Sequence, residues 1–310
     1  MSAPNADVKR AGVATSAMAK LCTFSFILAC VLPVAFSWHS IRVLIPLIVT
    51  NDTLSHVPLI PLVSFFLIYV NRKVVFSEVS FEWRLGAALI TPGLAILCMS
   101  LTNSWQSTAT NQFSLMLFAL VLYWLGTFVL FFGAKAFWAA RFPLFFLLFT
   151  VPIPEPFLSQ LILYLQKGSA GAAEVFFRIA GIPHLRQGLE FTLPGVRIRV
   201  AEECSGIRST LALFITTVLA CHLFLRATWR KLFLCVFVVP IAIIKNGLRI
   251  ATLSALAIYV DPGFLHGSLH HYGGIVFFVF ALLPTVALLI FFQKRELGTS
   301  LQSKVCEQES

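Results

Sequence analysis

The chain has 310 residues, of which 58% are hydrophobic and only 12% are charged. A soluble domain carries about twice that charged fraction, because its surface must meet water. The composition therefore excludes a soluble globular enzyme and a disordered chain, and it indicates a polytopic membrane protein. The net charge of +10 does not indicate a nucleic-acid partner, because Lys and Arg stand in short clusters between apolar runs. That is the pattern of loop charges that orient a membrane protein.

Eight apolar runs approach the roughly 20 residues with which a helix crosses a bilayer. They fall at about 21–37, 57–71, 85–102, 113–133, 138–153, 205–225, 231–260 and 273–292. We therefore expect an all-α polytopic membrane protein with about eight transmembrane helices, forming a single integral membrane domain over residues 1–310. The first run resembles a signal peptide, but further spans follow it at once, so we interpret it as an uncleaved anchor.

The placement of positive charge predicts the orientation of these spans. Most Lys and Arg fall in alternate loops and in the two tails, 1–20 and 293–310. The short loops on the opposite side contain only Arg42; they lie at about 38–56, 103–112 and 261–272. Because short cytoplasmic loops are enriched in Lys and Arg, we expect both termini to be cytoplasmic. The long segment 154–203 is then extracytoplasmic.

Local patterns predict structure within this extracytoplasmic segment. Three prolines between 152 and 156 end the fifth run, and residues 157–180 are typical of an amphipathic or interfacial helix. Apolar residues alternate along 188–201 on both sides of a Pro-Gly pair at 194–195, which predicts a β-hairpin. The hairpin leads directly to Cys204 and the sixth run.

Cys204 stands where the sixth helix is expected to begin. A helix N-terminus favours a thiolate, and Arg208 lies one turn deeper on the same face. The neighbouring Glu202 and Glu203 oppose this effect, and a small core cysteine is the other interpretation. The seven cysteines show no disulfide or metal-binding spacing.

Arg249 lies about 27 Å up its helix from Lys231, near the outer edge of the hydrocarbon. Asn246 and Lys245 precede it by three and four residues and share its face. The guanidinium has the donors to stabilise an oxyanion. We expect Lys245, in contrast, to extend towards the lipid headgroups.

Three histidines, His266, His270 and His271, lie in the last outer loop. Histidine is the usual general base near neutral pH. Only Asp261 accompanies them as a further ligand, so we expect neither a metal nor a cofactor.

The topology places a cysteine, an arginine and a histidine at one level on the outer side. A thiol, a base and a fixed cation are the groups that acyl transfer at a peptide bond requires. Two other functions remain open: a transporter or channel, and an envelope-polysaccharide assembly protein without chemistry of its own. Against transport, the third to fifth runs have no ionisable residue at their centres.

Three sequence blocks, VAEECSGIRS, NGLRI and HHYGGIVFF, resemble the signatures of the exosortase/archaeosortase family of membrane cysteine transpeptidases. The earlier segment NDTLSHVPLIPL also resembles a block of this family, and the likeness extends over about residues 40–290. The blocks in this order are specific to the family, whereas each block alone would be weak evidence of a resemblance.

The resemblance implies an active site of Cys204, Arg249 and His270, with His270 chosen because it stands four residues before Gly274. His266 and His271 remain alternatives, and Arg208 and Asn246 are supporting residues. The implied activity is cleavage of the C-terminal sorting tail of exported proteins through a thioester, at the bacterial inner membrane. The tail consists of a Pro-Glu-Pro-type motif, one span and a basic end, and a glycan or lipid is a possible acceptor.

Overall fold

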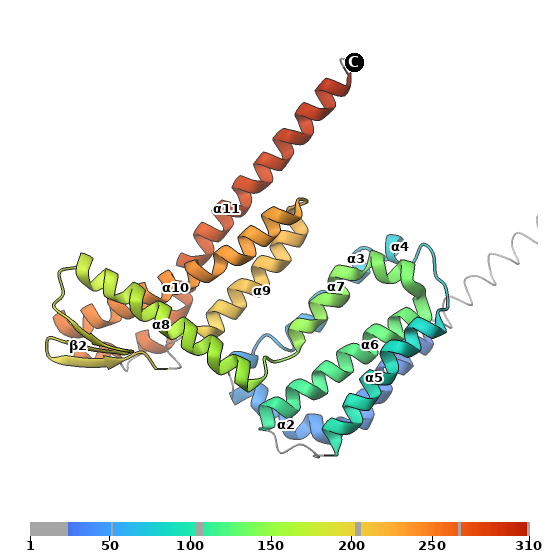
Figure 1. Cartoon of the computed structure of the whole chain (residues 1–310), viewed down its shortest axis with the longest axis horizontal. Helices are drawn as coiled ribbons and strands as arrows, with labels where there is room; N and C mark the ends of the chain where they lie inside the picture. Colours follow the sequence, from blue (N-terminus) through green and yellow to red (C-terminus); the bar gives the residue numbers. More distant parts are fainter. Residues whose placement is uncertain (1–23, 51, 103–107, 202–205, 266–267, 309–310) are drawn as a thin grey trace, which may run out of the picture. The chain divides into compact units, whose positions relative to one another are not determined.

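The fold is mostly helical, as the computed structural model in Figure 1 shows. The structure describes residues 24–50, 52–102, 108–201, 206–265 and 268–308. The chain divides into two compact units, Met1–Glu155 and Pro156–Ser310. Each unit is described separately below.

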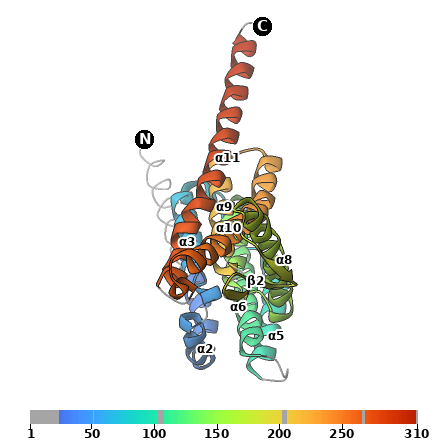
Figure 2. The same ribbon diagram turned by 90° about the vertical axis from the view of Figure 1, so that its left-hand side faces the viewer.

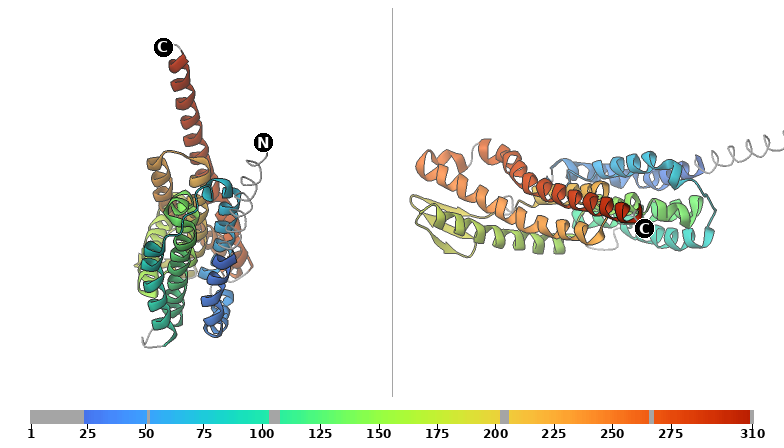
Figure 3. Two further views of the ribbon diagram at one scale, coloured as in Figure 1. Left: turned by 90° about the vertical axis from the view of Figure 1, so that its right-hand side faces the viewer. Right: turned by 90° about the horizontal axis from the view of Figure 1, so that it is seen from above.

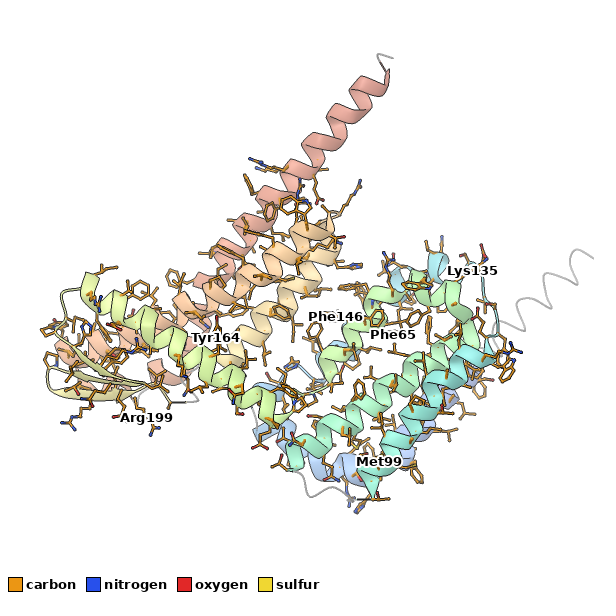
Figure 4. All side chains as sticks on the ribbon, in the orientation of Figure 1. Phe65, Met99, Lys135, Phe146, Tyr164 and Arg199 are labelled. Atoms are coloured by element: carbon orange, nitrogen blue, oxygen red, sulfur yellow. The ribbon has the colours of Figure 1, made fainter. Side chains whose placement is uncertain are left out.

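The first unit is built from helices. Its elements are Phe24–Phe36, α2 (Trp38–Thr50), η1 (Asp52–Leu54), α3 (Leu59–Val70), α4 (Arg72–Val75), α5 (Trp83–Leu101), α6 (Ala109–Ala139), α7 (Arg141–Phe146) and η2 (Leu147–Thr150). Helices α5 and α6 approach closely because glycines line their seam: a Cβ atom at Gly93 would lie 2.9 Å from the Tyr123 nitrogen. Met99 and Lys135 mark opposite ends of this pair in Figure 4.

Within the segment NDTLSHVPLIPL, residues 52–54 form η1 and residues 59–62 form the start of α3. Leu54, Val57 and Ile60 from it are buried in the first unit. The half-buried His56 imidazole bonds to the Phe149 and Thr53 backbones. Burial lowers the pKa of His56 from its ordinary value, and these two bonds only partly oppose the effect.

The second unit combines helices with a small sheet. Its elements are α8 (Glu155–Ile179), β1 (Leu185–Gln187), β2 (Glu190–Leu193), β3 (Val196–Arg199), α9 (Ile207–Phe224), α10 (Thr228–Tyr259), η4 (Pro262–Leu265) and α11 (Ser268–Gln308). The sheet is antiparallel in the order β1-β2-β3. The predicted hairpin is confirmed as β2 and β3, and the predicted helix is α8; β1 was not predicted.

One face of the sheet packs against α8 and α10 (Figure 2). Phe191 and Leu193 point inward with Val200, in the alternation expected from the sequence. They share a buried cluster with Phe177 of α8 and Ile250 of α10. Arg199, labelled in Figure 4, lies on the exposed face. The hairpin is therefore fixed to two helices.

Helices α9, α10 and α11 pack side by side in the second unit (Figure 3). A buried group that we call the middle layer joins them; it consists of Leu213, Val238, Ile241 and Ala281. Nearer the C-terminus of α9, a second group contains Cys221, Leu225, Leu234, Leu289 and Phe292. The order of these contacts shows that α10 runs antiparallel to both α9 and α11.

Among the residues that the structure describes, five helices are long and apolar enough to cross a membrane: Trp83–Leu101, Ala109–Ala139, Ile207–Phe224, Thr228–Tyr259 and Val276–Gly298. A sixth span is possible if Arg141–Thr150 and Glu155–Ile179, bent by 87°, count together. Phe24–Phe36 and α3 are helical as expected, and their described lengths are shorter than a bilayer requires. The all-α polytopic class is confirmed, whereas the count of eight spans is not. The single membrane domain and the orientation stay predictions.

Candidate active site

Several predicted site residues lie towards one end of the α9–α10–α11 group. Measured along each helix from the middle layer, Gly206 lies about 10 Å away, Arg249 about 12 Å and the backbone of His270 about 16 Å. All three lie in the same direction, because α10 runs antiparallel to its two neighbours. This end of the second unit therefore holds the described parts of the three sequence blocks.

Some predicted residues lie outside the described part of the chain. They are Cys204 with its neighbours Glu202 and Glu203, and His266. His270 and His271 belong to the first turn of α11, but their side chains are outside the described part as well. Arg208 is exposed on the first turn of α9, and Arg249 is half-buried on α10. The catalytic roles therefore stay predictions.

The backbone just before residue 202 is held by α8. The Gln166 side chain donates from Nε2 to the Val200 carbonyl at 2.9 Å, and the Val200 N–H donates to the Leu189 carbonyl at 2.9 Å. Val200 is itself buried. The end of the hairpin is thereby fixed to the helix beneath it.

The backbone just after residue 205 is held by α9 and α10. Gly206 precedes α9 in the left-handed region with φ +71°, which favours glycine. Its carbonyl accepts bonds from the Ser209 hydroxyl at 3.0 Å and from the Thr210 hydroxyl at 2.8 Å. A Cβ atom on Gly206 would lie 3.0 Å from Cγ of Asn246. The chain on either side of residues 202–205 is therefore anchored.

Two consecutive polar residues of α10 face this anchor and are almost fully buried. Asn246, which is 1% exposed, donates from Nδ2 to the Ser169 hydroxyl of α8 at 3.0 Å. Lys245, which is 6% exposed, donates from Nζ to the Ser209 hydroxyl of α9. The expectation that Lys245 extends to the headgroups is wrong, because its side chain turns inward to a hydroxyl on the neighbouring helix.

Ser169, Ser209 and Gln166 were missed as site residues. Their signal in the sequence was weak, since single hydroxyl and amide side chains are common in apolar helices, where they bond to their own backbone. In α8, Gln166 and Ser169 are three residues apart and therefore on one face. That spacing could have identified the polar face of α8 that contacts the hairpin and α10.

The geometry favours chemistry that develops negative charge. The positive end of the α9 helix dipole lies at its N-terminus, which directly follows residues 202–205 in the chain. Arg249 lies one turn from Asn246 on α10 and supplies a permanent cation at this end. Within the described ranges, no three His, Cys, Asp or Glu side chains come close enough to hold a metal ion.

Comparison with known proteins gives one match. Residues 38–287 match the model of a family described as transmembrane exosortase (Exosortase_EpsH). No curated protein and no solved structure matches the chain. The matched region includes both anchors of residues 202–205, the polar pair of α10 and the start of α11.

Proposed function

The chain belongs to the transmembrane exosortase family, and on that premise we propose that it is a membrane cysteine transpeptidase. It cleaves the C-terminal sorting tail of exported proteins, with Cys204 as nucleophile, Arg249 as oxyanion donor and His270 as acid and base. The enzyme resides in the bacterial inner membrane with both termini cytoplasmic and its site on the extracytoplasmic side. It needs no cofactor.

The contact between Gly206 and Asn246 is the observation that carries this proposal. Covalent geometry limits the Cα atom of Cys204 to about 7 Å from that of Gly206, since only one residue lies between them. Asn246 lies against Gly206, and Arg249 follows Asn246 by one helical turn. This contact supports the proposal that a thiol at 204 and a guanidinium at 249 act on one peptide bond.

The proposed reaction proceeds through a thioester. His270 takes the Cys204 proton, and the thiolate attacks the scissile carbonyl while Arg249 donates hydrogen bonds to the oxyanion. The C–S bond forms, the C–N bond breaks, and His270 returns the proton to the leaving amine. Water, or the amine or hydroxyl of a glycan or lipid acceptor, then resolves the thioester. His266 and His271 are the alternative bases, and Arg208 and Asn246 support the site.

The location suits a substrate that is itself anchored in the bilayer. A sorting tail with one span and a basic end presents its Pro-Glu-Pro-type motif just outside the membrane. The position of the proposed site at one end of the apolar helices α9 and α10 supports an encounter with such a motif. The internal Pro-Glu-Pro of this chain begins α8 and is interpreted as a helix-breaking turn.

Reconstitution tests the proposal. We expect the full chain in liposomes to shorten a tagged protein that carries such a tail, and a membrane-impermeant thiol reagent to stop the reaction. A matched substrate with the motif replaced by alanines should remain intact. With a nucleophilic acceptor present, a larger product indicates transfer and a simple carboxylate indicates hydrolysis. An intact tail in liposomes that conduct a solute through the protein would instead favour the transporter, and an intact tail without conduction would favour the assembly protein.

A further inference from the structure

We propose that Lys245 and Asn246 are positioning residues that fix the first turn of α9 and thereby hold Cys204 ready to attack. We call Lys245, Asn246, Ser209 and Ser169 the α10 clamp. This inference rests on the proposed function, since it assigns a role towards the nucleophile of that reaction. Lys245 and Asn246 would act on Cys204 indirectly, through the backbone that follows it.

The first arm of the α10 clamp is a chain of two hydrogen bonds. The Lys245 ammonium donates to Ser209 Oγ, and the Ser209 hydroxyl in turn donates to the Gly206 carbonyl at 3.0 Å. An ammonium polarises the hydroxyl that it contacts, which strengthens the onward bond. A positive charge on α10 is thus coupled to a backbone carbonyl two residues after Cys204.

The second arm is a steric contact. Asn246 donates a hydrogen bond from Nδ2 to Ser169 of α8, and its amide group lies 3.0 Å from the position that a Cβ atom on Gly206 would take. Gly247, the next residue, packs so closely on α8 that a Cβ atom there would lie 2.5 Å from the Ala172 Cβ atom. The close packing of α8 and α10 keeps Asn246 in place. Gly206 is therefore held from two directions by neighbouring residues of one helix.

The burial of Lys245 argues against a purely space-filling role. An ionisable side chain within a membrane span is costly, and an apolar residue would fill the same space at lower cost. Lys245 is 6% exposed and its ammonium reaches Ser209. The side chain that bears this cost is directed at the first turn of α9, which follows the proposed nucleophile in the chain, and this is what a positioning role requires.

Variants of the full-length protein test the α10 clamp. Lys245→Met removes the ammonium at similar length, Ser209→Ala removes the relay hydroxyl, and Ser209→Thr retains it. Two readouts are compared: the rate at which an impermeant maleimide alkylates Cys204, measured on the Cys204 peptide by mass spectrometry, and kcat against KM for tail removal. We expect Lys245→Met and Ser209→Ala to lower the alkylation rate and kcat about tenfold each with KM unchanged. Ser209→Thr should stay within about twofold of wild type.

Matched controls are available on the same helices. Thr217→Ala and Ser254→Ala remove buried hydroxyls that donate only to the Leu213 and Ile250 carbonyls of their own helices. Both should keep wild-type alkylation and kcat. An equal loss in these controls would overturn the α10 clamp, because any buried hydroxyl would then matter.

Other outcomes separate the α10 clamp from the proposed function. If Lys245→Met reacts and turns over like wild type while Cys204→Ala is inactive, the α10 clamp alone is contradicted. If Cys204→Ala still cleaves, the proposed function fails and the α10 clamp with it. Should Lys245→Met not fold, the comparison of Ser209→Ala with Ser209→Thr decides: equal alkylation rates in both would overturn the inference.

Discussion

Replacing Cys204 with alanine is expected to lower tail removal by at least about 10⁴-fold, because no thioester can form without the thiolate. The measurement places the variant as the sole enzyme copy in cells that carry a tagged substrate, and it quantifies the shortened product. Cys204→Ser should also be severely impaired, since a hydroxyl is far less acidic than a thiol. Undiminished shortening by the alanine variant would contradict the assignment.

A matched control is Cys221→Ala. Cys221 is buried near the opposite end of α9, where its sulfur lies 3.9 Å from the Lys231 carbonyl. We expect this variant to cleave like wild type, since the change is small and remote from residue 204. A comparable loss of cleavage in both variants at equal protein levels would show that cysteine replacement acts through packing.

Replacing Arg249 with lysine is expected to lower kcat about 100-fold. Lysine keeps the charge but lacks the planar fork of donors, so one or more bonds to the developing oxyanion are lost. Because these bonds are strongest in the transition state, KM should change little. Steady-state kinetics of tail removal on a purified substrate provide the measurement.

Arg230→Lys is the matched control for this change. Arg230 lies on the same helix, α10, near its start, where it donates to the Phe292 carbonyl at 3.2 Å and pairs with Glu296 at 3.4 Å. The control should retain normal kcat because it is remote from Arg249. Near-normal turnover of the Arg249→Lys enzyme would mean that charge alone suffices, and would contradict a forked oxyanion contact.

Local structure with a regular hydrophobic period could be predicted from the sequence. The alternation along 188–201 predicted the β2–β3 hairpin, and Phe191 and Leu193 do point into the core. The start of α9 follows the expected position because Gly206 adopts the left-handed conformation before it. In contrast, β1 has only three residues, too few to show an alternation.

Structural features that depend on residues far apart in the chain could not be predicted from the sequence. The direction of the Lys245 side chain is set by Ser209 on a neighbouring helix, 36 positions away, and the sequence of α10 alone favoured the lipid surface. The expected count of eight spans is not confirmed, for a similar reason. The run at 138–153 contains only the first member of a bent helix pair, Arg141–Thr150, because prolines interrupt the chain before the second member, Glu155–Ile179.

Isolation of the acyl-enzyme tests the central claim most directly. Membranes containing the full chain and a tagged substrate are quenched in acid during turnover, and the adduct is mapped by mass spectrometry. A covalent complex that is cleaved by hydroxylamine and mapped to the sulfur of Cys204 is the predicted result. Turnover without any such adduct, or an adduct on the oxygen of Ser209, would contradict a cysteine transpeptidase.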